Sequence, residues 1–246
     1  MSITLITGDC MKVLPSFSDE SFDCAVLDPP YNETALTWDR WPPGWPTAVR
    51  RVLKRTGSMW VFGSQRMFLE RIGEFAGWRF AQDVIWEKHN GSSFKADRFK
   101  RVHECALQFW RDDAPWAGVY RKPQFTNDAT ARTIKTRGQT PHTGRIGNDV
   151  NYRTVEGGPR LQRSVIFARS EHGRAVHPTQ KPIEIVEPLL LYSCPIGGAV
   201  LDCFAGSGTV GVVAQRHGID ATLIEGDQKF VAIACQRLGL DRGAAA

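Results

Sequence analysis

The last fifty residues of this 246-residue chain carry the pattern that most restricts its fold. An apolar run at Ala199–Cys203 leads through a glycine-rich turn into a helical pattern from about Thr209 to His217. A second apolar run at Ala221–Glu225 and a helical pattern over Gln228–Leu238 follow. Strands and helices that alternate in this way form a parallel sheet with crossover helices. The chain is therefore expected to be an α/β protein.

The same alternation runs through the first 110 residues and resumes after residue 163. It predicts a doubly wound, mostly parallel sheet with helices on both faces. Further helices are expected at Arg66–Phe75 and from Ile183 to about Ser193. The remaining strand candidates are Ile3–Ile6, Cys24–Leu27, Ser58–Phe62, Ala81–Trp86, Glu104–Trp110 and Ser164–Ala168.

The periodic pattern disappears from about residue 112 to 162, where Thr, Arg, Gly, Asn and Pro replace aliphatic residues. Long segments of this kind inside a domain are usually functional or disordered. Residues 95–174 also hold sixteen Lys or Arg against eight Asp or Glu, in a chain whose total net charge is +5. The simpler interpretation is a solvated loop, and a polyanion becomes the favoured partner only beside a site for nucleic-acid chemistry. Residues 1–111 and 163–246 are expected to form one domain, with 112–162 as an irregular basic insertion.

Composition excludes several classes of protein. No apolar run reaches the length of about eighteen residues that a membrane helix needs, and no charged leader precedes Ile3. We therefore expect a soluble, cytoplasmic protein. Its six cysteines show no C-x-x-C spacing, so they are expected to be reduced and mostly buried, and no metal site is implied.

The turn that follows Ala199–Cys203 contains Gly206 and Gly208, which let the backbone approach a ligand closely. Their spacing is not that of dinucleotide enzymes, and no Lys follows to hold a triphosphate. A glycine turn alone is equally consistent with a tight strand-to-helix connection. Glu225, however, ends the next strand, where doubly wound folds place a carboxylate on ribose hydroxyls. Together the two features predict a bound adenosine-type cofactor.

The tetrapeptide Asp28-Pro29-Pro30-Tyr31 follows the buried-strand pattern Asp23–Leu27. Ligands of open α/β sheets bind at this carboxyl end. Two prolines fix the backbone and remove two N–H donors, which leaves the Asp28 carboxylate and the Pro29 carbonyl as a rigid pair of acceptors. Such a pair suits a neutral amine on an aromatic ring, and Tyr31 offers a face for stacking, worth about 1–3 kcal/mol per base. A proline turn is the alternative, which the flanking Asp and Tyr disfavour.

Three segments together resemble the DNA amino-methyltransferases that act on adenine N6 or cytosine N4. They are Asp28–Tyr31 with the following Asn32, His177-Pro178-Thr179-Gln180-Lys181-Pro182, and Asp202–Thr209. Their order, with the catalytic motif first and the cofactor loop last, is that of the β group of the family. The resemblance covers nearly the whole chain apart from the insertion. It implies a Rossmann-like, circularly permuted methyltransferase fold, with 112–162 as a target-recognition insertion.

The resemblance implies S-adenosylmethionine as the cofactor and Asp28–Tyr31 as the catalytic residues. Glu225 would hold the ribose, Asp9 would contact the adenine, and Thr179 and Lys181 would face the methionine carboxylate. The residues implied to bind the cofactor are Asp9, Cys10, Asp28, Thr179, Lys181, Asp202, Phe204, Ala205, Gly206, Ser207, Gly208, Thr209 and Glu225.

Other positions near these motifs carry weaker indications. Cys203 stands where the family usually has proline, a change that preserves volume. The segments Trp86–Lys88 and Arg98–Glu104 resemble the wall around the target base, although the last two residues of the second are more often a structural pair than a chemical one. The aromatic segment Trp38–Trp45 either closes over the site and enters the duplex, or forms a hydrophobic lid on the core.

Double-stranded DNA is the expected partner. The chain lacks the separate C-terminal DNA-binding domain of some longer relatives, so the resemblance shifts DNA contacts to the basic insertion, where some residues would contact phosphates and others guanines. The predicted DNA-binding residues are Arg121, Lys122, Arg132, Lys135, Arg137, Arg145 and Arg153. Relatives often form homodimers, and a companion restriction enzyme is a further partner; both stay open at this point.

The predicted reaction is direct in-line transfer of a methyl group from S-adenosylmethionine to the N6 amine of a flipped-out adenine in DNA. Cytosine N4 is the nearest alternative, because its amine presents the same hydrogens, but Asp at the first motif position favours adenine within the family. A DNA-binding regulator with an inactive methyltransferase fold is disfavoured by the intact Asp28–Tyr31. Methylation of RNA or of a protein amide is disfavoured because such enzymes usually carry Asn at this position, after their cofactor loop.

Overall fold

The chain divides into two compact units, which are described separately. The computed structural model describes residues 1–92, 97, 99–136, 139–140, 144–145, 150–170 and 180–241. Unit 1 comprises Met1–Lys122 and Ser164–Ala246, and unit 2 comprises Pro123–Arg163. Of the predicted site residues, Arg137 and Thr179 lie outside the described part of the chain.

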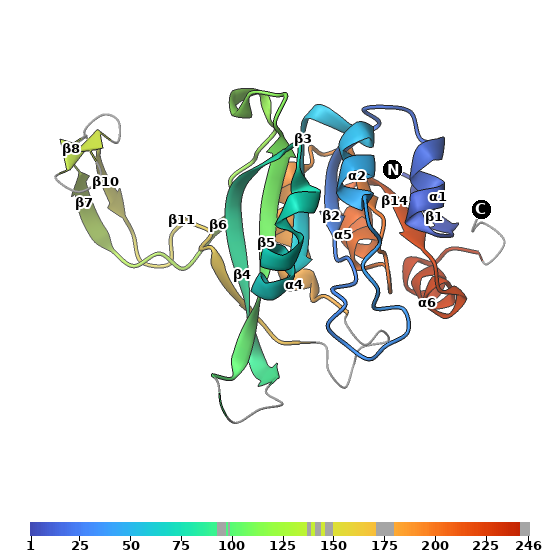
Figure 1. Ribbon diagram of the computed structural model, residues 1–246. Coiled ribbons are helices and arrows are strands. Elements are labelled where there is room, and N and C mark those ends of the chain that lie inside the picture. The colour runs from blue at the N-terminus through green and yellow to red at the C-terminus, as the bar shows by residue number, and fades with distance from the viewer. Residues whose placement is uncertain are drawn as a thin grey trace. The chain divides into compact units, whose positions relative to one another are not determined.

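The described residues of unit 1 build one eight-stranded sheet (Figure 1). Neighbouring strands run parallel except at β5, which is antiparallel to both β3 and β4. In spatial order the strands are β1 Ile3–Thr7, β14 Asp220–Glu225, β13 Ala199–Asp202, β2 Phe22–Leu27, β3 Leu53–Gly63, β5 Arg101–Arg111, β4 Trp78–Ser92 and β12 Val165–Ala168. The predicted, mostly parallel sheet is confirmed, and it pairs the strands from the two ends of the sequence, β1 and β14.

Helices cover both faces of this sheet, as a doubly wound fold requires (Figure 1). Along β2, Cys24 and Val26 belong to the core beneath α4, α5 and α6, whereas Ala25 and Leu27 belong to the core beneath α1, α2 and α3. This alternation arises because successive side chains of a strand point to opposite faces. The helices are α1 Cys10–Val13, α2 Trp45–Val52, α3 Gln65–Arg71, α4 Ile183–Ser193, α5 Thr209–His217 and α6 Gln228–Leu238, with short 3-10 turns η1 Leu14–Ser16, η2 Ile72–Phe75 and η3 Trp116–Gly118.

The three C-terminal helices have the predicted bounds, and the helix predicted at Arg66–Phe75 is α3 followed by η2. Helix α2 was not predicted. It begins at Trp45, which is fully buried and packs edge-on against Phe75 and Phe204, with ring centroids 5.9 and 5.4 Å away. This end of the aromatic segment is therefore part of the hydrophobic core. None of the helices in the described residues combines the length and apolar character needed to cross a membrane.

The four parallel strands β1, β14, β13 and β2 all end at the same edge of the sheet. The acidic residues at or just after these ends are, in the same order, Asp9, Glu225, Asp202 and Asp28. The turn that joins β13 to α5 uses the left-handed backbone region, with φ of +52° at Gly206 and +77° at Gly208. Glycine adopts this conformation without the penalty that a Cβ would bring, so the turn can stay close to the sheet edge.

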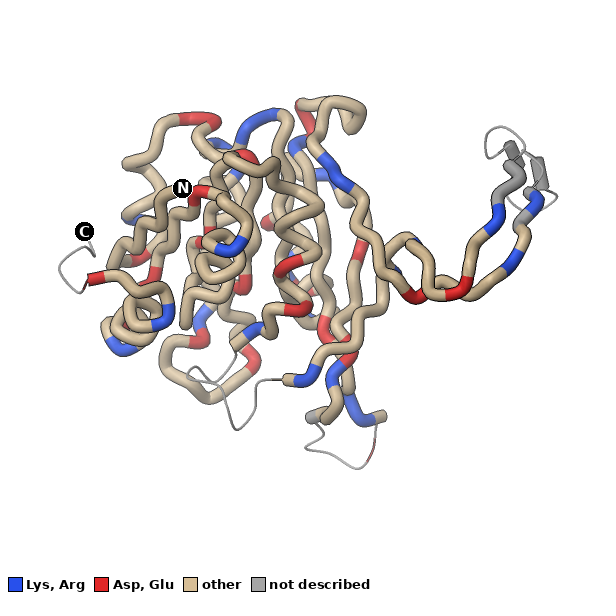
Figure 2. The backbone as a smooth tube through the Cα atoms, turned by 180° about the vertical axis from the view of Figure 1, so that it is seen from behind, with Lys and Arg blue, Asp and Glu red and all other residues tan. Residues whose placement is uncertain are grey.

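Unit 2 is less irregular than the sequence indicates. Its described residues form antiparallel ribbons, and Lys and Arg occur along both strands of the longest one (Figure 2). The ribbon pairs are β6 Phe125–Thr126 with β11 Arg160–Leu161, β7 Arg132–Thr136 with β10 Val150–Thr154, and β8 Gln139–Thr140 with β9 Gly144–Arg145. These strands are only two to five residues long, which is too short for an alternation of apolar and polar residues to identify them in the sequence.

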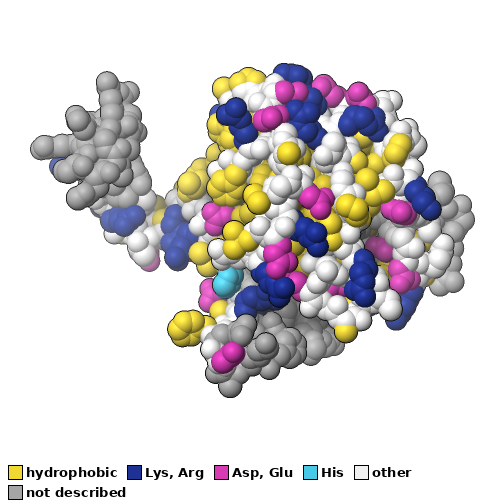
Figure 3. All heavy atoms as spheres, in the orientation of Figure 1, with side chains coloured by type: hydrophobic (Ala, Val, Ile, Leu, Met, Phe, Trp, Pro, Cys, Tyr) yellow, Lys and Arg dark blue, Asp and Glu magenta, His cyan; other side chains and the backbone are white. Residues whose placement is uncertain are grey.

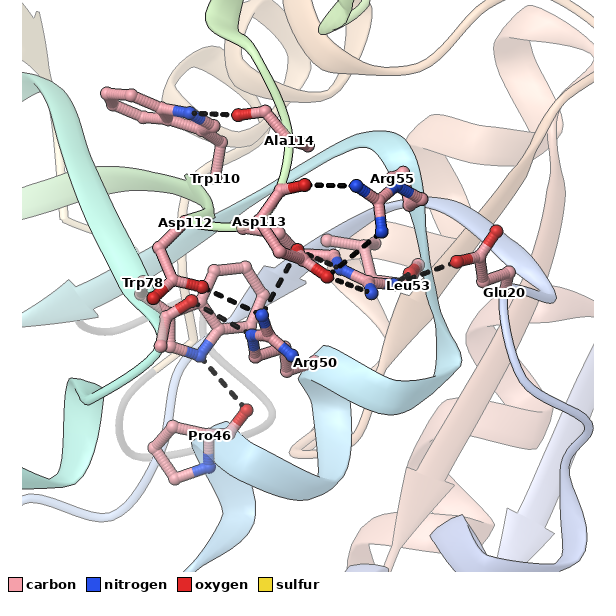
Figure 4. A network of polar contacts seen from close by, with 12 residues as sticks. Glu20, Pro46, Arg50, Leu53, Arg55, Trp78, Trp110, Asp112, Asp113 and Ala114 are labelled. Atoms are coloured by element: carbon pink, nitrogen blue, oxygen red, sulfur yellow. Dashed lines mark hydrogen bonds and ion pairs between the residues drawn. The ribbon is translucent and has the colours of Figure 1, made fainter.

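A network of Arg and Asp side chains joins β5 to α2 at the edge of the sheet where β3 begins (Figure 4). The buried Arg111 donates to both oxygens of Asp113, at 3.0 and 2.8 Å, and also to the Leu53 carbonyl and Glu20. Arg50 lies 3.1 Å from Asp113. The hydrogen bonds from Arg111 lower the pKa of Asp113 to about 2. The network therefore stays ionised at neutral pH.

Arg111→Met is expected to lower the free energy of unfolding by about 2–3 kcal/mol, because it leaves the Leu53 carbonyl and Asp113 without their main donor. Arg111→Lys should recover only part of this loss, since an ammonium group cannot make the bidentate contact. Urea denaturation at pH 7 measures both changes. Equal stability of the wild-type chain and Arg111→Met would show that the network contributes nothing.

Candidate functional site

A cavity of about 700 Å³ lies at the edge of the sheet where β1, β14, β13 and β2 end. This volume is typical of small-molecule sites. Pro30 and Trp38 contribute to its lining, and Trp38 meets Phe230 edge-on at 6.2 Å. One end of the aromatic segment thus faces the cavity, whereas Trp45 lies in the core. The predicted cofactor residues that line the cavity are Asp9, Cys10, Asp28, Lys181, Asp202, Phe204, Ala205, Gly206, Ser207, Thr209 and Glu225.

Asp28 follows β2 and lines the cavity, and each of its carboxylate oxygens accepts a hydrogen bond. Its Oδ1 accepts a hydrogen bond from the Tyr31 hydroxyl at 2.7 Å, and its Oδ2 accepts one from Lys181 Nζ at 2.5 Å. Lys181 itself is only 8% exposed and precedes α4. The structure therefore brings together a residue of the tetrapeptide and a residue of the predicted motif His177–Pro182, which are 153 positions apart in the sequence.

A second carboxylate, Glu104 of β5, completes this cluster. Its Oε1 lies 2.7 Å from the Tyr31 hydroxyl and 3.0 Å from Lys181 Nζ, and its Oε2 accepts from Lys88 Nζ at 2.7 Å. From the sequence, Glu104 is expected at the end of a segment that resembles the wall around the target base, and a structural pair with His103 is favoured over a chemical role. The available signal is the resemblance of both Arg98–Glu104 and Trp86–Lys88 to the wall around the target base, because the second segment supplies Lys88, the ion-pair partner of Glu104.

The pKa values of the two carboxyl groups move in opposite directions. Burial raises the pKa of Asp28 above its usual range, although Lys181 opposes the shift. Burial acts in the same sense on Glu104, but Lys181 and Lys88 outweigh it and lower the pKa of Glu104 to about 2. The negative charge of the cluster is therefore held most firmly on Glu104.

Two further carboxyl groups, those of Asp202 and Glu225, face the same cavity. Asp202 is 4% exposed, and burial raises its pKa to about 8, with nearby Asp28 and Glu225 adding to the effect. Glu225 Oε2 accepts from the Gly206 amide at 2.7 Å, and burial raises the pKa of Glu225 as well. A positive ligand would stabilise the ionised forms of these groups, so the cavity favours a cation. No three His, Cys, Asp or Glu side chains among the described residues are grouped as a metal site.

Hydrogen bonds tie the glycine loop to the segment that carries Lys181. The Ser207 hydroxyl donates to Gln180 Oε1 at 3.2 Å, and the Thr209 hydroxyl donates to the Lys181 carbonyl at 3.3 Å. From α6, Arg237 donates to the Ser207 carbonyl at 2.7 Å. The loop and the Asp28 cluster are therefore held by one set of contacts.

Comparison with known proteins agrees with this arrangement. The sequence model of a family described as DNA methylase, which covers N6 and N4 methyltransferases, matches residues 22–236. The type II methyltransferase M.HinfI of Haemophilus influenzae is 29% identical over 266 aligned positions, which cover 96% of this chain and 68% of that protein. Because the family model matches most of the sequence, this chain belongs to the DNA methylase family.

Solved structures share the fold at lower identity. The structure of the M1.HpyAVI-SAM complex matches with a TM-score of 0.64 and 22% identity, over 96% of this chain and all of that chain. PvuII DNA methyltransferase, described as cytosine-N4-specific, matches with a TM-score of 0.65 and 17% identity, over 98% of this chain and 88% of its own. The Rossmann-like methyltransferase fold expected from the resemblance is thereby confirmed.

Asp202→Asn is expected to stabilise the ligand-free protein at pH 8 but not near pH 4. The folded-state pKa of Asp202, about 8, lies above the value of an unfolded chain, so its contribution to stability is complete below pH 4 and is lost as the pH rises to 8. The free energy of unfolding falls by at most about 1.4 kcal/mol per pH unit in this range. Asparagine does not ionise, so it abolishes this loss of stability, and its side-chain oxygen can still accept from the Phe204 amide. Denaturation of both proteins across this pH range measures the effect. A gain that is equal at both ends of the range would contradict the assignment.

Proposed function

We propose that this DNA methylase transfers a methyl group from S-adenosylmethionine to the N6 amine of adenine in double-stranded DNA. The observation that carries the proposal is that Asp28 and the glycine loop line the same cavity. A methyl donor bound along the loop would lie beside an amine held by Asp28, which is the proximity that a direct transfer needs. Asp at the first position of the Asp28–Tyr31 motif is the feature that favours adenine.

The cavity suits S-adenosylmethionine because this cofactor carries a sulfonium and an ammonium group. Asp202 and Glu225 would stabilise positive charge, and Glu225 would also accept the ribose hydroxyls. Asp9 would meet the adenine, while Lys181 and Thr179 would face the carboxylate. When bound, the cofactor supplies a methyl group on a positively charged sulfur.

The chain's contribution to the reaction follows from the acceptors at Asp28 and Pro29. A base flipped from the duplex would direct its two amine hydrogens at these acceptors, so that the nitrogen lone pair turns toward the methyl group. Positive charge would develop on the nitrogen as it takes the methyl group and S-adenosylhomocysteine leaves. The Asp28 carboxylate would stabilise this charge, without forming a covalent bond, until the nitrogen releases a proton. The ring of Tyr31 would stack on the base and hold it in place.

The ribbon formed by β7 and β10 supports a role for unit 2 in DNA binding. The described charged side chains of these strands, Arg132, Lys135 and Arg153, are all basic and exposed, and a two-stranded ribbon fits the major groove. The strand register puts Lys135 and Arg153 on one face and Arg132 on the other. The viewed face of unit 1, in contrast, mixes acidic and basic side chains (Figure 3).

The remaining predicted DNA contacts differ in their surroundings. Arg121 lies over the Trp116 ring at 5.1 Å and donates to the carbonyls of Trp116 and Val119, so it also braces its own turn. Lys122 is exposed and its backbone N–H bonds to Tyr192. Arg145 lies on β9. We therefore expect Lys135 and Arg153 to contribute most to phosphate binding.

Asp28→Ala should reduce methyl transfer by about 10³-fold or more, because it removes the acceptor for the amine and the stabilising charge. Cofactor affinity should stay nearly unchanged. Glu225→Ala should show the converse and weaken cofactor binding by about 1–3 kcal/mol. Labelled methyl transfer to DNA and calorimetric titration with S-adenosylmethionine separate the two effects. Substantial turnover by Asp28→Ala would contradict its role.

Mass spectrometry of nucleosides from DNA treated with the protein and cofactor identifies the modified base. N6-methyladenine is expected. N4-methylcytosine would keep the role of Asp28 but overturn the choice of base, because both amines present two hydrogens to the same acceptors. Absence of any methylated base would overturn the proposed function.

Lys135→Ala and Arg153→Ala should each weaken DNA binding and make the salt dependence shallower. Each lost phosphate contact lowers the slope of log K against log salt concentration by about 0.9. Arg66→Ala is the matched control, since Arg66 is an exposed cation on α3 of unit 1 and pairs with Glu70. Fluorescence anisotropy with duplex DNA at several salt concentrations gives the slopes. A slope that changes in the control but not in the ribbon variants would place the DNA elsewhere.

A further inference from the structure

The donors that occupy Asp28 share a second acceptor. Tyr31 and Lys181 each contact Asp28, and each also lies within hydrogen-bond distance of Glu104 Oε1, at 2.7 and 3.0 Å. The same carboxylate therefore offers an alternative partner to both groups. Glu104 comes from β5 and reaches the cluster from a different part of the sheet than Asp28.

The number of hydrogens on each donor limits how many carboxylates it can serve at once. The Tyr31 hydroxyl has one hydrogen, so it can donate to Asp28 or to Glu104 but not to both at once. Lys181 has three hydrogens and can serve both carboxylates. An incoming amine must find acceptor capacity on Asp28, whose two oxygens each already accept one strong donor. Each Asp28 oxygen keeps a second lone pair for the amine, but a donor already bound there makes it a weaker acceptor, so the amine binds more strongly once these donors shift to Glu104.

We propose that Glu104 is a positioning residue that takes over Tyr31 and Lys181 when the target amine binds to Asp28. This inference rests on the proposed function and adds a specific group that makes Asp28 available. Glu104 is well placed for the task because Lys88 holds its other oxygen at 2.7 Å and keeps the carboxylate fixed between the two strands β4 and β5. The proposal needs no proton transfer, only an exchange of hydrogen-bond acceptors.

Glu104→Gln is the first test, in a steady-state assay of DNA methylation. The amide oxygen of the variant accepts hydrogen bonds more weakly than a carboxylate and carries no charge. Tyr31 and Lys181 should therefore keep their hydrogen bonds to Asp28. We expect kcat to fall by at least about tenfold, with KM for DNA and the dissociation constant of S-adenosylmethionine nearly unchanged. Glu187→Gln is the matched control, because Glu187 on α4 pairs with His217 on α5 at 2.8 Å and is not one of the residues that line the cavity. It should leave kcat at the wild-type value.

A second variant separates this role from a merely structural one. Tyr31→Phe in the Glu104→Gln background removes the single hydroxyl that blocks Asp28 Oδ1 and keeps the ring for stacking. The double variant should therefore be several-fold more active than Glu104→Gln, because the two substitutions are coupled. A structural role predicts a further loss instead, and that result would overturn the proposal. If Glu104→Gln does not fold, Glu104→Asp with and without Tyr31→Phe gives the same comparison, since the shorter side chain withdraws from both donors.

The wild-type chain in the same assay distinguishes this inference from the proposed function. Normal kcat in Glu104→Gln beside an active wild type overturns only the role of Glu104. Methylation of a cytosine amine by the wild type leaves the test valid, because Asp28 then holds that amine. A wild-type chain that methylates no DNA overturns both.

Discussion

Parallel strands that end at one edge of a sheet bring their terminal side chains together, and in this protein four such strands have an acid at or just after their end. Asp28, Asp202 and Glu225 face one cavity, and among the described residues of its lining Lys181 is the only cation. Burial raises the pKa of all three carboxyl groups. The chain thus collects carboxyl groups in a setting that disfavours their charged forms, and a positively charged cofactor explains why the arrangement is useful.

The opposite edge of the sheet uses charge in another way. There, Asp113 contacts Arg50 and Arg111, and its pKa is lowered. Acids at that edge are matched by fixed guanidinium groups, so they stabilise the fold without a ligand. One edge of the sheet therefore contributes to stability and the other to ligand binding. These two roles often conflict when a single site has to fulfil both.

Much of this architecture is readable from the sequence because it depends on local signals. Apolar periodicity and the glycines of the β13 turn identify the parallel sheet and the bounds of α5 and α6. Helix α2 also has a signal, since Trp45, Val49 and Val52 are buried at helical spacing, but Pro46 at its first turn obscures it. Proline is well tolerated in the first turn of a helix, so Pro46 is better interpreted as the start of a helix than as the end of one.

The contacts of Glu104 illustrate what sequence patterns do not predict. Its place in the site depends on β5 lying antiparallel between β3 and β4, with Glu104 opposite Trp86 in the register. No local pattern specifies that pairing, and the contact with Tyr31 joins residues 73 positions apart. The ribbons of unit 2 were not predicted for a different reason, because strands of two to five residues are too short to show a clear alternation of apolar and polar residues.

The pairing of β1 with β14 has a consequence for how the molecule is made. In the sheet, β14 and β13 lie between β1 and β2, so these two strands, which are consecutive in the sequence, are not neighbours. β1 has no hydrogen-bonding partner in the sheet until β14 has been synthesised, and the Gly8 amide cannot bond to the Glu225 carbonyl before then. Such long-range pairing slows folding and leaves apolar strands open during synthesis. Residues from both ends of the described chain line the cofactor cavity, so a protein whose synthesis stops before β13 and β14 cannot hold the methyl donor.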